Sequence, residues 1–189
     1  MSAYADPEMS PEMPTTQPSP RPRTDCPATR AALLPAHNAA LTALTGFHTA
    51  RARLQAYAGH SEPEHLLLLA DALRWAYAAD RAIAMLDGMT YLGARAYDRD
   101  GRVLVGLHYV RTRCADQWAL AIKPTVGRGF PRHQARPITC VWRGLRELPA
   151  AEPGRHDPPG RPEYATYLAG HAPRGSLDAV ARWFGRATG

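Results

Sequence analysis

The chain has 189 residues, of which 45% are hydrophobic, and it carries a formal net charge of +6. This length suits one domain with a substantial core, and the hydrophobic fraction excludes a wholly disordered chain. No run approaches the ~20 apolar residues that cross a bilayer, and no charged-then-apolar leader opens the sequence. We therefore expect a cytoplasmic protein that does not enter a membrane.

The cysteines argue against a disulfide-stabilised or metal-bound fold. There are three, an odd number, and no Cys-x-x-Cys pair occurs. The spacing of His108, Cys114, His133 and Cys140 does not match that of zinc-finger ligands, so we expect neither a metal nor a cofactor. A reducing compartment fits this cysteine usage.

Positive charge is concentrated in the second half of the chain. Residues 1–90 have a charge balance of −2, whereas residues 91–189 have a balance of +8. Of the 23 basic residues, only Lys123 is a lysine. Arginine suits contact with phosphates and bases, but GC-rich coding in a bacterial genome gives the same bias everywhere, and we favour that explanation for the ratio. The clustering of the basic residues needs a separate explanation.

A tail and a single domain are predicted first. Residues 1–30 contain seven prolines and almost no large apolar side chains. Such a segment cannot bury enough surface to offset the entropy lost on ordering. We therefore predict a disordered Pro-rich tail at 1–30 and one globular domain at 31–189.

Two helices follow the tail. Residues 35–58 place apolar side chains at helical spacing, and Pro35 suits a first helical turn. Ser61 and Glu64 match a capping box, which predicts a second helix that ends at Gly88. Because the connection between the helices is short, they should form an antiparallel hairpin.

Asp80 is an unusual residue in the second helix. On a helical wheel it lies opposite the charged stripe and beside apolar neighbours. A carboxylate that faces a core must be paired or protonated, so we predict an internal ion pair with Arg51, Arg95 or Arg111. Nothing in the spacing of Asp80 and Asp87 indicates a catalytic pair.

Extended segments are predicted after Gly88. The sequence Asp98-Arg99-Asp100-Gly101 has the Asp-Gly pair of a tight turn between antiparallel strands. Alternating and β-branched residues on both sides favour strands. The four predicted strands are 90–97, 102–111, 117–122 and 138–143.

Two helices should close the chain. One runs from Pro162 to before Gly170, and Ser176 should cap the other, over 177–186. The predicted fold class is α+β, with an N-terminal antiparallel helical hairpin, a four-stranded antiparallel sheet and C-terminal helices.

A basic window is the clearest functional signal. Between Lys123 and Arg146 lie six basic residues and no acidic one. Uncompensated cationic surface is what proteins use to meet phosphates, and an aromatic ring there can stack on a base. The predicted nucleic-acid or polyanion site consists of Lys123, Arg128, Phe130, Arg132, His133, Arg136 and Arg143. The alternative is a solvated loop whose Arg side chains pair with acids elsewhere, such as Glu147 or the acidic helix faces.

Three functions remain open from the sequence. The first is a small cytoplasmic binding protein that contacts nucleic acid or another polyanion. The second is a protein–protein adaptor or scaffold that uses the helical hairpin and the tail. An enzyme ranks last, and no catalytic residue is predicted, because no nucleophile–base pattern and no phosphate-cradling glycine motif occurs.

Overall fold

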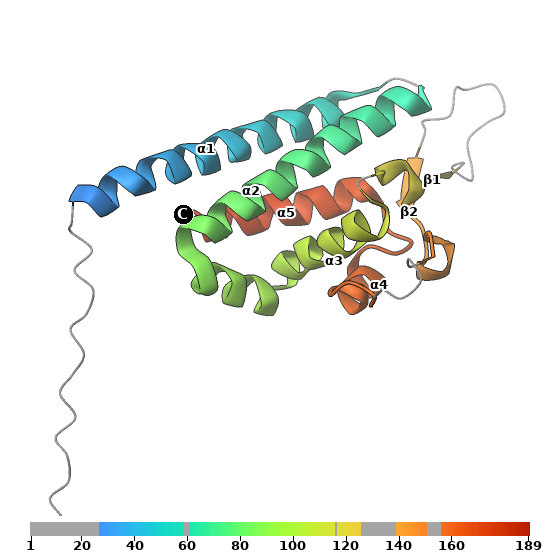
Figure 1. The fold of residues 1–189 in the computed structure, drawn as a ribbon. Helices are drawn as coiled ribbons and strands as arrows, with labels where there is room; N and C mark the ends of the chain where they lie inside the picture. The colour runs from blue at the N-terminus through green and yellow to red at the C-terminus, as the bar shows by residue number, and fades with distance from the viewer. Residues whose placement is uncertain (1–26, 59–60, 116, 126–138, 151–155) are drawn as a thin grey trace, which may run out of the picture.

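The computed structural model describes residues 27–58, 61–115, 117–125, 139–150 and 156–189. Within these ranges the fold is mostly helical, with one two-stranded antiparallel sheet at one end (Figure 1). None of the described helices has the length and apolar character needed to cross a bilayer. The predicted tail lies outside the described residues except for 27–30, which form the start of the first helix. The helices are α1 (Pro27–Ala56), α2 (Glu62–Tyr97), α3 (Arg99–Arg113), α4 (Arg161–Tyr167) and α5 (Pro173–Ala187).

The predicted helical hairpin is confirmed. α1 and α2 lie side by side and run in opposite directions (Figure 1). They approach closely at Gly46, where a Cβ atom would lie only 2.5 Å from the Trp75 indole. α1 starts earlier than predicted, at Pro27, and Pro35 lies inside the helix instead of at its first turn. The buried face of α1 consists of Ala40, Ala43, Phe47, Ala50 and Leu54.

The start of α2 follows half of the predicted capping box. The Ser61 hydroxyl accepts a hydrogen bond from the Glu64 backbone N–H, as an N-cap does. In a complete capping box the Glu64 side chain would also accept a hydrogen bond from the Ser61 backbone N–H. Here the Tyr57 hydroxyl lies between the two groups: it accepts from the Ser61 N–H and donates to the Glu64 carboxylate at 2.9 Å. Tyr57 at the end of α1 is thereby tied to the start of α2.

Gly88 bends α2 instead of ending it. Its backbone angles are φ 55° and ψ −127°, a conformation that glycine tolerates and other residues avoid. After this bend the chain continues as helix to Tyr97. The prediction of a strand at 90–97 is therefore wrong, because a glycine that breaks a helix does not by itself change the secondary structure that follows.

The second predicted strand, 102–111, is also wrong, since this segment belongs to α3. Asp98 is the N-cap of α3: its carboxylate accepts hydrogen bonds from the backbone N–H groups of Asp100 and Gly101, at 2.8 and 3.0 Å. The Asp-Arg-Asp-Gly sequence thus starts a helix where a hairpin turn was predicted. The segment is apolar on several sides and packs against α2, α4 and α5, so its residue pattern suits a covered helix as well as a covered strand.

In the part of the chain that the structure describes, the sheet has two strands where four were predicted. β1 (Ile122–Thr125) pairs antiparallel with β2 (Thr139–Trp142), with Ile122 opposite Trp142. β2 confirms the strand predicted at 138–143, but half of 117–122 is occupied by the 3₁₀ turn η1 (Trp118–Leu120), and only Ile122 of that range lies in a strand. A second 3₁₀ turn, η2, covers Leu145–Glu147.

The two C-terminal helices are confirmed, with one correction at α5. This helix begins at Pro173, so Ser176 is not its cap. Ser176 is instead buried in the first turn, and its hydroxyl oxygen accepts a hydrogen bond from the Trp142 indole N–H at 3.0 Å. α5 lies beneath the hairpin in Figure 1, and its Phe184 ring meets the edge of Phe47 from α1 at 5.4 Å.

Candidate functional site

Only part of the predicted basic site falls within the described residues. Arg128, Phe130, Arg132, His133 and Arg136 lie outside them. The Lys123 ammonium contacts the Glu147 carboxylate at 2.6 Å, and this hydrogen bond lowers the Glu147 pKa. Arg143 is partly buried, and its backbone carbonyl accepts a hydrogen bond from the Tyr164 hydroxyl at 2.6 Å. Of the predicted set, Lys123 therefore has an acidic neighbour, Glu147, whereas the alternative explanation had paired that acid with an arginine.

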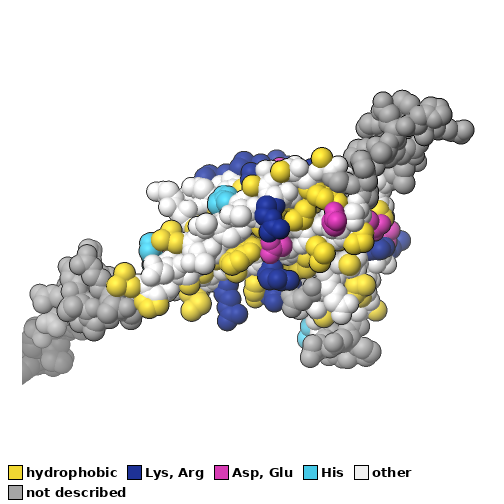
Figure 2. Space-filling view, turned by 90° about the horizontal axis from the view of Figure 1, so that it is seen from above, with side chains coloured by type: hydrophobic (Ala, Val, Ile, Leu, Met, Phe, Trp, Pro, Cys, Tyr) yellow, Lys and Arg dark blue, Asp and Glu magenta, His cyan; other side chains and the backbone are white. Residues whose placement is uncertain are grey.

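Described basic side chains do not form one continuous patch on the face shown in Figure 2. At the centre of that face, basic side chains flank an acidic one, and other basic side chains lie toward the edges. Hydrophobic side chains are spread between them. The distribution of charge therefore does not locate a binding site on this face. A site has to be located from the arrangement of individual side chains.

A buried polar cluster centred on Asp80 links the helices. Only 1% of Asp80 is exposed. Its Oδ1 accepts a hydrogen bond from the Tyr91 hydroxyl at 2.6 Å. Its Oδ2 contacts the Arg95 guanidinium and lies 2.7 Å from His108 Nε2. The predicted internal ion pair is thus confirmed, with Arg95 as the partner.

The Asp80 cluster keeps its carboxylate ionised. Burial alone raises the pKa of Asp80, but the hydrogen bond with His108 and the charge of Arg95 outweigh it, so the pKa lies below its ordinary value. Burial and the neighbouring Asp80 charge raise the pKa of Tyr91, whose hydroxyl therefore remains a donor. The same hydroxyl accepts from the Trp183 indole N–H at 3.0 Å, which connects α5 to the cluster.

His108 connects this buried cluster to the surface. Its side chain is 32% exposed, and its ring centroid lies 4.8 Å from that of Tyr77. The guanidinium carbon of Arg111 lies 3.6 Å from the centre of the Tyr77 ring, the geometry of a cation–π contact. His108, Tyr77, Arg111 and Trp118 are among the residues around a small cavity of about 10 Å³.

Beyond this cavity an open groove of about 660 Å³ runs between α2, α3 and η1. One part of it is apolar, and another carries two arginines and two aromatic rings. The Trp118 ring packs at a steep angle against Trp142, with centroids 6.3 Å apart, which holds it in place. Arg74 is exposed and has no ion-pair partner among the described residues. The groove is lined by Pro63, Leu66, Leu67, Ala70, Arg74, Tyr77, Arg111, Gln117, Trp118 and Ala119.

The groove can hold a ligand, whereas the polar cluster behind it holds helices together. Asp80 and His108 resemble two members of a catalytic triad, but no described hydroxyl or thiol hydrogen-bonds to His108. Burial raises the pKa of Cys114 and of Cys140, which keeps both as thiols. Among the described residues, no group of three or more His, Cys, Asp or Glu side chains is placed to hold a metal ion.

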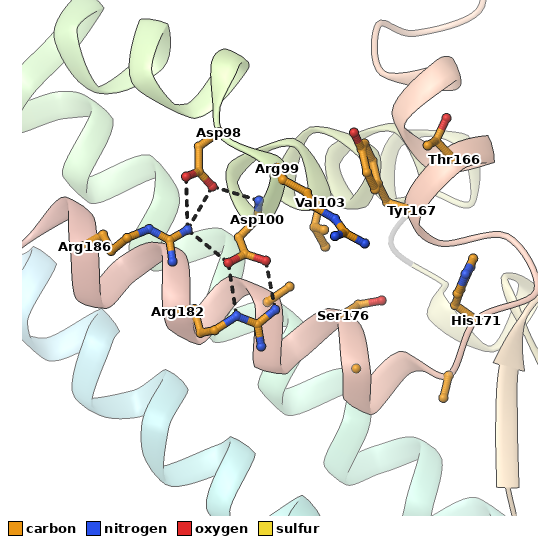
Figure 3. A pocket seen from close by; sticks show the side chains of 13 residues that line it. Asp98, Arg99, Asp100, Val103, Thr166, Tyr167, His171, Ser176, Arg182 and Arg186 are labelled. Atoms are coloured by element: carbon orange, nitrogen blue, oxygen red, sulfur yellow. Dashed lines mark hydrogen bonds and ion pairs between the residues drawn. The ribbon is translucent and has the colours of Figure 1, made fainter.

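A second pocket, of about 600 Å³, lies between α3, α4 and α5 (Figure 3). Asp98 and Asp100 from the start of α3 face Arg182 and Arg186 from α5, with Arg186–Asp98 and Arg182–Asp100 contacts of 2.9 Å. The hydrogen bond from Arg182 lowers the pKa of Asp100. Because these four charges neutralise one another, we interpret the ion pairs in this pocket mainly as contacts that hold α3 against α5.

Comparison with known proteins identifies no relative. No protein-family model matches the chain, and neither the curated proteins nor the solved structures contain a significant match. Function is therefore inferred from the side chains themselves.

The groove residues were not predicted from the sequence. Arg74 and Tyr77 stand three residues apart on α2 and so share a face of that helix, which is the one local signal available. Arg111 and Trp118 were assigned to strands, and they join the groove only because α3 and η1 fold back beside α2. Such a juxtaposition depends on tertiary structure and leaves no spacing pattern in the sequence.

Proposed function

We propose that this protein binds single-stranded nucleic acid in the groove between α2, α3 and η1. The observation that carries the proposal is the combination of Arg74 and Arg111 with the rings of Tyr77 and Trp118 in one groove. Proteins that bind single strands pair cationic side chains, which follow the phosphates, with aromatic rings on which bases stack. A groove of about 660 Å³ also falls in the size range of small-ligand sites, which suits the entry of a base.

In this proposal the exposed Arg74 contacts a phosphate and the Trp118 ring stacks on a base. Apolar residues of the groove such as Leu66 and Ala70 receive the rest of the base. The chain that follows η1 passes through β1 and then enters the basic segment 126–138. We propose that Arg128, Arg132 and Arg136 of that segment extend the phosphate contacts, with Phe130 as a further stacking residue.

The competing assignment is a groove for an apolar peptide, as in a protein–protein adaptor. Apolar side chains make up much of the lining, so the chemistry of the ligand has to be tested directly. The two ligands differ in their response to salt. Phosphate contacts release counterions and weaken steeply as salt rises, whereas apolar peptide contacts do not.

Fluorescence anisotropy with labelled single-stranded DNA and RNA tests the proposal. We expect binding at low salt that weakens as salt rises, and weaker binding by the Arg74→Ala and Trp118→Leu variants. Arg99→Ala is the matched control, since Arg99 is also exposed and unpaired among the described residues but lines the other pocket. Equal losses in Arg74→Ala and Arg99→Ala would indicate general charge attraction without a site in the groove.

The contribution of the basic segment is tested separately. The triple variant Arg128→Ala, Arg132→Ala, Arg136→Ala should lower the affinity and the salt dependence together, because it removes proposed phosphate contacts. If the wild-type chain retains no single-stranded nucleic acid at low salt, the proposed function is wrong. Salt-insensitive binding of apolar peptides in the same assay would support the adaptor assignment.

A further inference from the structure

The solvent-facing side of α1 carries a regular strip of exposed residues. The core side of the helix is formed by residues such as Ala40, Phe47 and Leu54. On the opposite side, exposed residues recur at alternating spacings of four and three. This alternation keeps them on one face of the helix, as in the seam of a coiled coil. The strip consists of Leu34, Asn38, Leu41, Thr45, His48 and Ala52.

The α1 strip has no formal charge. Leu34 is 59% exposed and Leu41 is 51% exposed, and the sequence from 34 to 50 contains no Asp, Glu, Lys or Arg. Figure 2 looks down on α1, and toward the left of that view hydrophobic, histidine and uncharged side chains predominate. Depletion of charge is typical of the cores of protein interfaces, whereas free surfaces normally mix both signs of charge.

We propose that this strip pairs with the same strip of a second copy of the chain. In a two-fold symmetric contact a surface meets itself, so any charge near the axis would face its own copy. The α1 strip avoids that repulsion because it carries no charge, and a charged or strongly acidic partner would find nothing on it to complement. The four-and-three spacing also allows the leucines of one helix to pack between side chains of the other.

The paired helices run antiparallel. Arg51 and Arg53 flank one end of the strip, where they pair with Asp178 at 3.5 Å and with Asp71 at 3.8 Å, and a parallel arrangement would bring each of these ion pairs beside its own copy. The antiparallel arrangement places them at opposite ends of the contact. Leu41 and Thr45 flank the middle of the strip, so Leu41 of one chain lies opposite Thr45 of the other.

The size of the strip predicts a dimer that dissociates on dilution. From Leu34 to Ala52 the helix extends about 27 Å, and its width is about 10 Å. The area of a strip with these dimensions is less than the ~800 Å² that each partner buries in a standard interface. The dimer should therefore form as protein concentration rises, and it does not depend on nucleic-acid binding.

Analytical ultracentrifugation of the full chain over a concentration series tests the proposal. The wild-type chain should pass from monomer to dimer, and Leu41→Glu should raise the dissociation constant at least ~10-fold, which corresponds to about 1.4 kcal/mol. Leu120→Glu is the matched control, because Leu120 is an exposed leucine (44%) outside the strip. Its dissociation constant should equal that of the wild-type chain.

A mixing experiment tests the antiparallel arrangement. Chains with Leu41→Glu should associate more tightly with chains carrying Thr45→Arg than either does with itself, since the new charges then face each other. Circular dichroism checks that each variant retains its helices, and should Leu41→Glu unfold, Thr45→Arg alone tests the same strip. A wild-type chain that stays monomeric throughout, or a dimer unaffected by both strip variants, would overturn the proposal.

Discussion

The Arg95 guanidinium contacts the Asp80 carboxylate although the two residues stand fifteen positions apart on one helix. In a straight helix they would be about 22 Å apart along the axis. The bend at Gly88 brings the end of α2 back toward Asp80, so this contact depends on the backbone angles of a single glycine.

Replacing Gly88 by alanine should destabilise the fold. A Cβ atom there would meet no other atom within 4 Å, so the cost comes only from the backbone conformation, φ 55° and ψ −127°. Such strained conformations cost about 1–3 kcal/mol for residues other than glycine. Urea denaturation measures the loss. Gly93→Ala is the control, since Gly93 is helical and unobstructed, and alanine there should stabilise by up to about 1 kcal/mol.

Asp80→Asn should cost about 3–5 kcal/mol, because it leaves the largely buried Arg95 without its counter-charge. The variant should also change the response to acid. The pKa of Asp80 is lower in the folded chain, so its stabilising effect is present above the unfolded-state pKa and is lost as pH falls through the folded-state pKa.

The acid window for Asp80 therefore lies below about pH 4. Thermal unfolding followed from neutral pH to about pH 2 should show a steeper loss of stability for the wild-type chain than for Asp80→Asn. Asp100 and Glu147 also have lowered pKa values and titrate in both proteins, so the comparison isolates Asp80. Parallel curves for the two proteins would mean that folding does not change the pKa of Asp80.

Gly46→Ala should loosen the helical hairpin. The added Cβ would lie 2.5 Å from the Trp75 indole, so either the ring or the α1 backbone must move. Overpacking of this kind costs about 1–3 kcal/mol. Trp fluorescence should shift and the urea midpoint should fall, whereas Gly185→Ala, which meets no atom within 4 Å on α5, should leave the fluorescence unchanged and raise the midpoint slightly.

Two groove variants should separate phosphate contact from stacking. Arg74→Ala removes a proposed phosphate contact and should reduce the slope of log affinity against log salt by about 0.7. Trp118→Leu should weaken binding by about 1–3 kcal/mol at every salt concentration and leave the slope unchanged. Anisotropy titrations at several salt concentrations give both values. A slope that changes equally in the two variants would contradict the proposed roles.

The sequence predicted elements whose signals are local. The hairpin and the Ser61 cap each depend on residues within a few positions of one another, and Gly88 was recognisable as a helix interruption, although the helix resumes after it. The prediction of a strand at 102–111 was wrong because this segment is covered on several sides. A covered helix has no polar stripe that distinguishes it from a covered strand. The Asp-Gly pair before it was equally ambiguous, since Asp98 can cap a helix as well as open a turn.

The site could be predicted only where its residues form a recognisable sequence pattern on one helix. Asp80 was recognisable because a carboxylate stood on an apolar face. Its partner Arg95 was one of three candidates, since the choice depends on the direction of the bend at Gly88. The groove was not predictable, because Arg74 and Trp118 come from elements whose meeting is decided by packing across the whole domain.

The hydrogen bond between Trp183 and Tyr91 has a consequence for the order of events during synthesis. Asp80, Tyr91, Arg95 and His108 all precede Trp183 along the chain, so a nascent protein exposes a partly assembled cluster until α5 leaves the ribosome. A ribosome stalled before that point should carry a chain whose bend is vulnerable to proteases. Emergence of α5 would then confer resistance in one step.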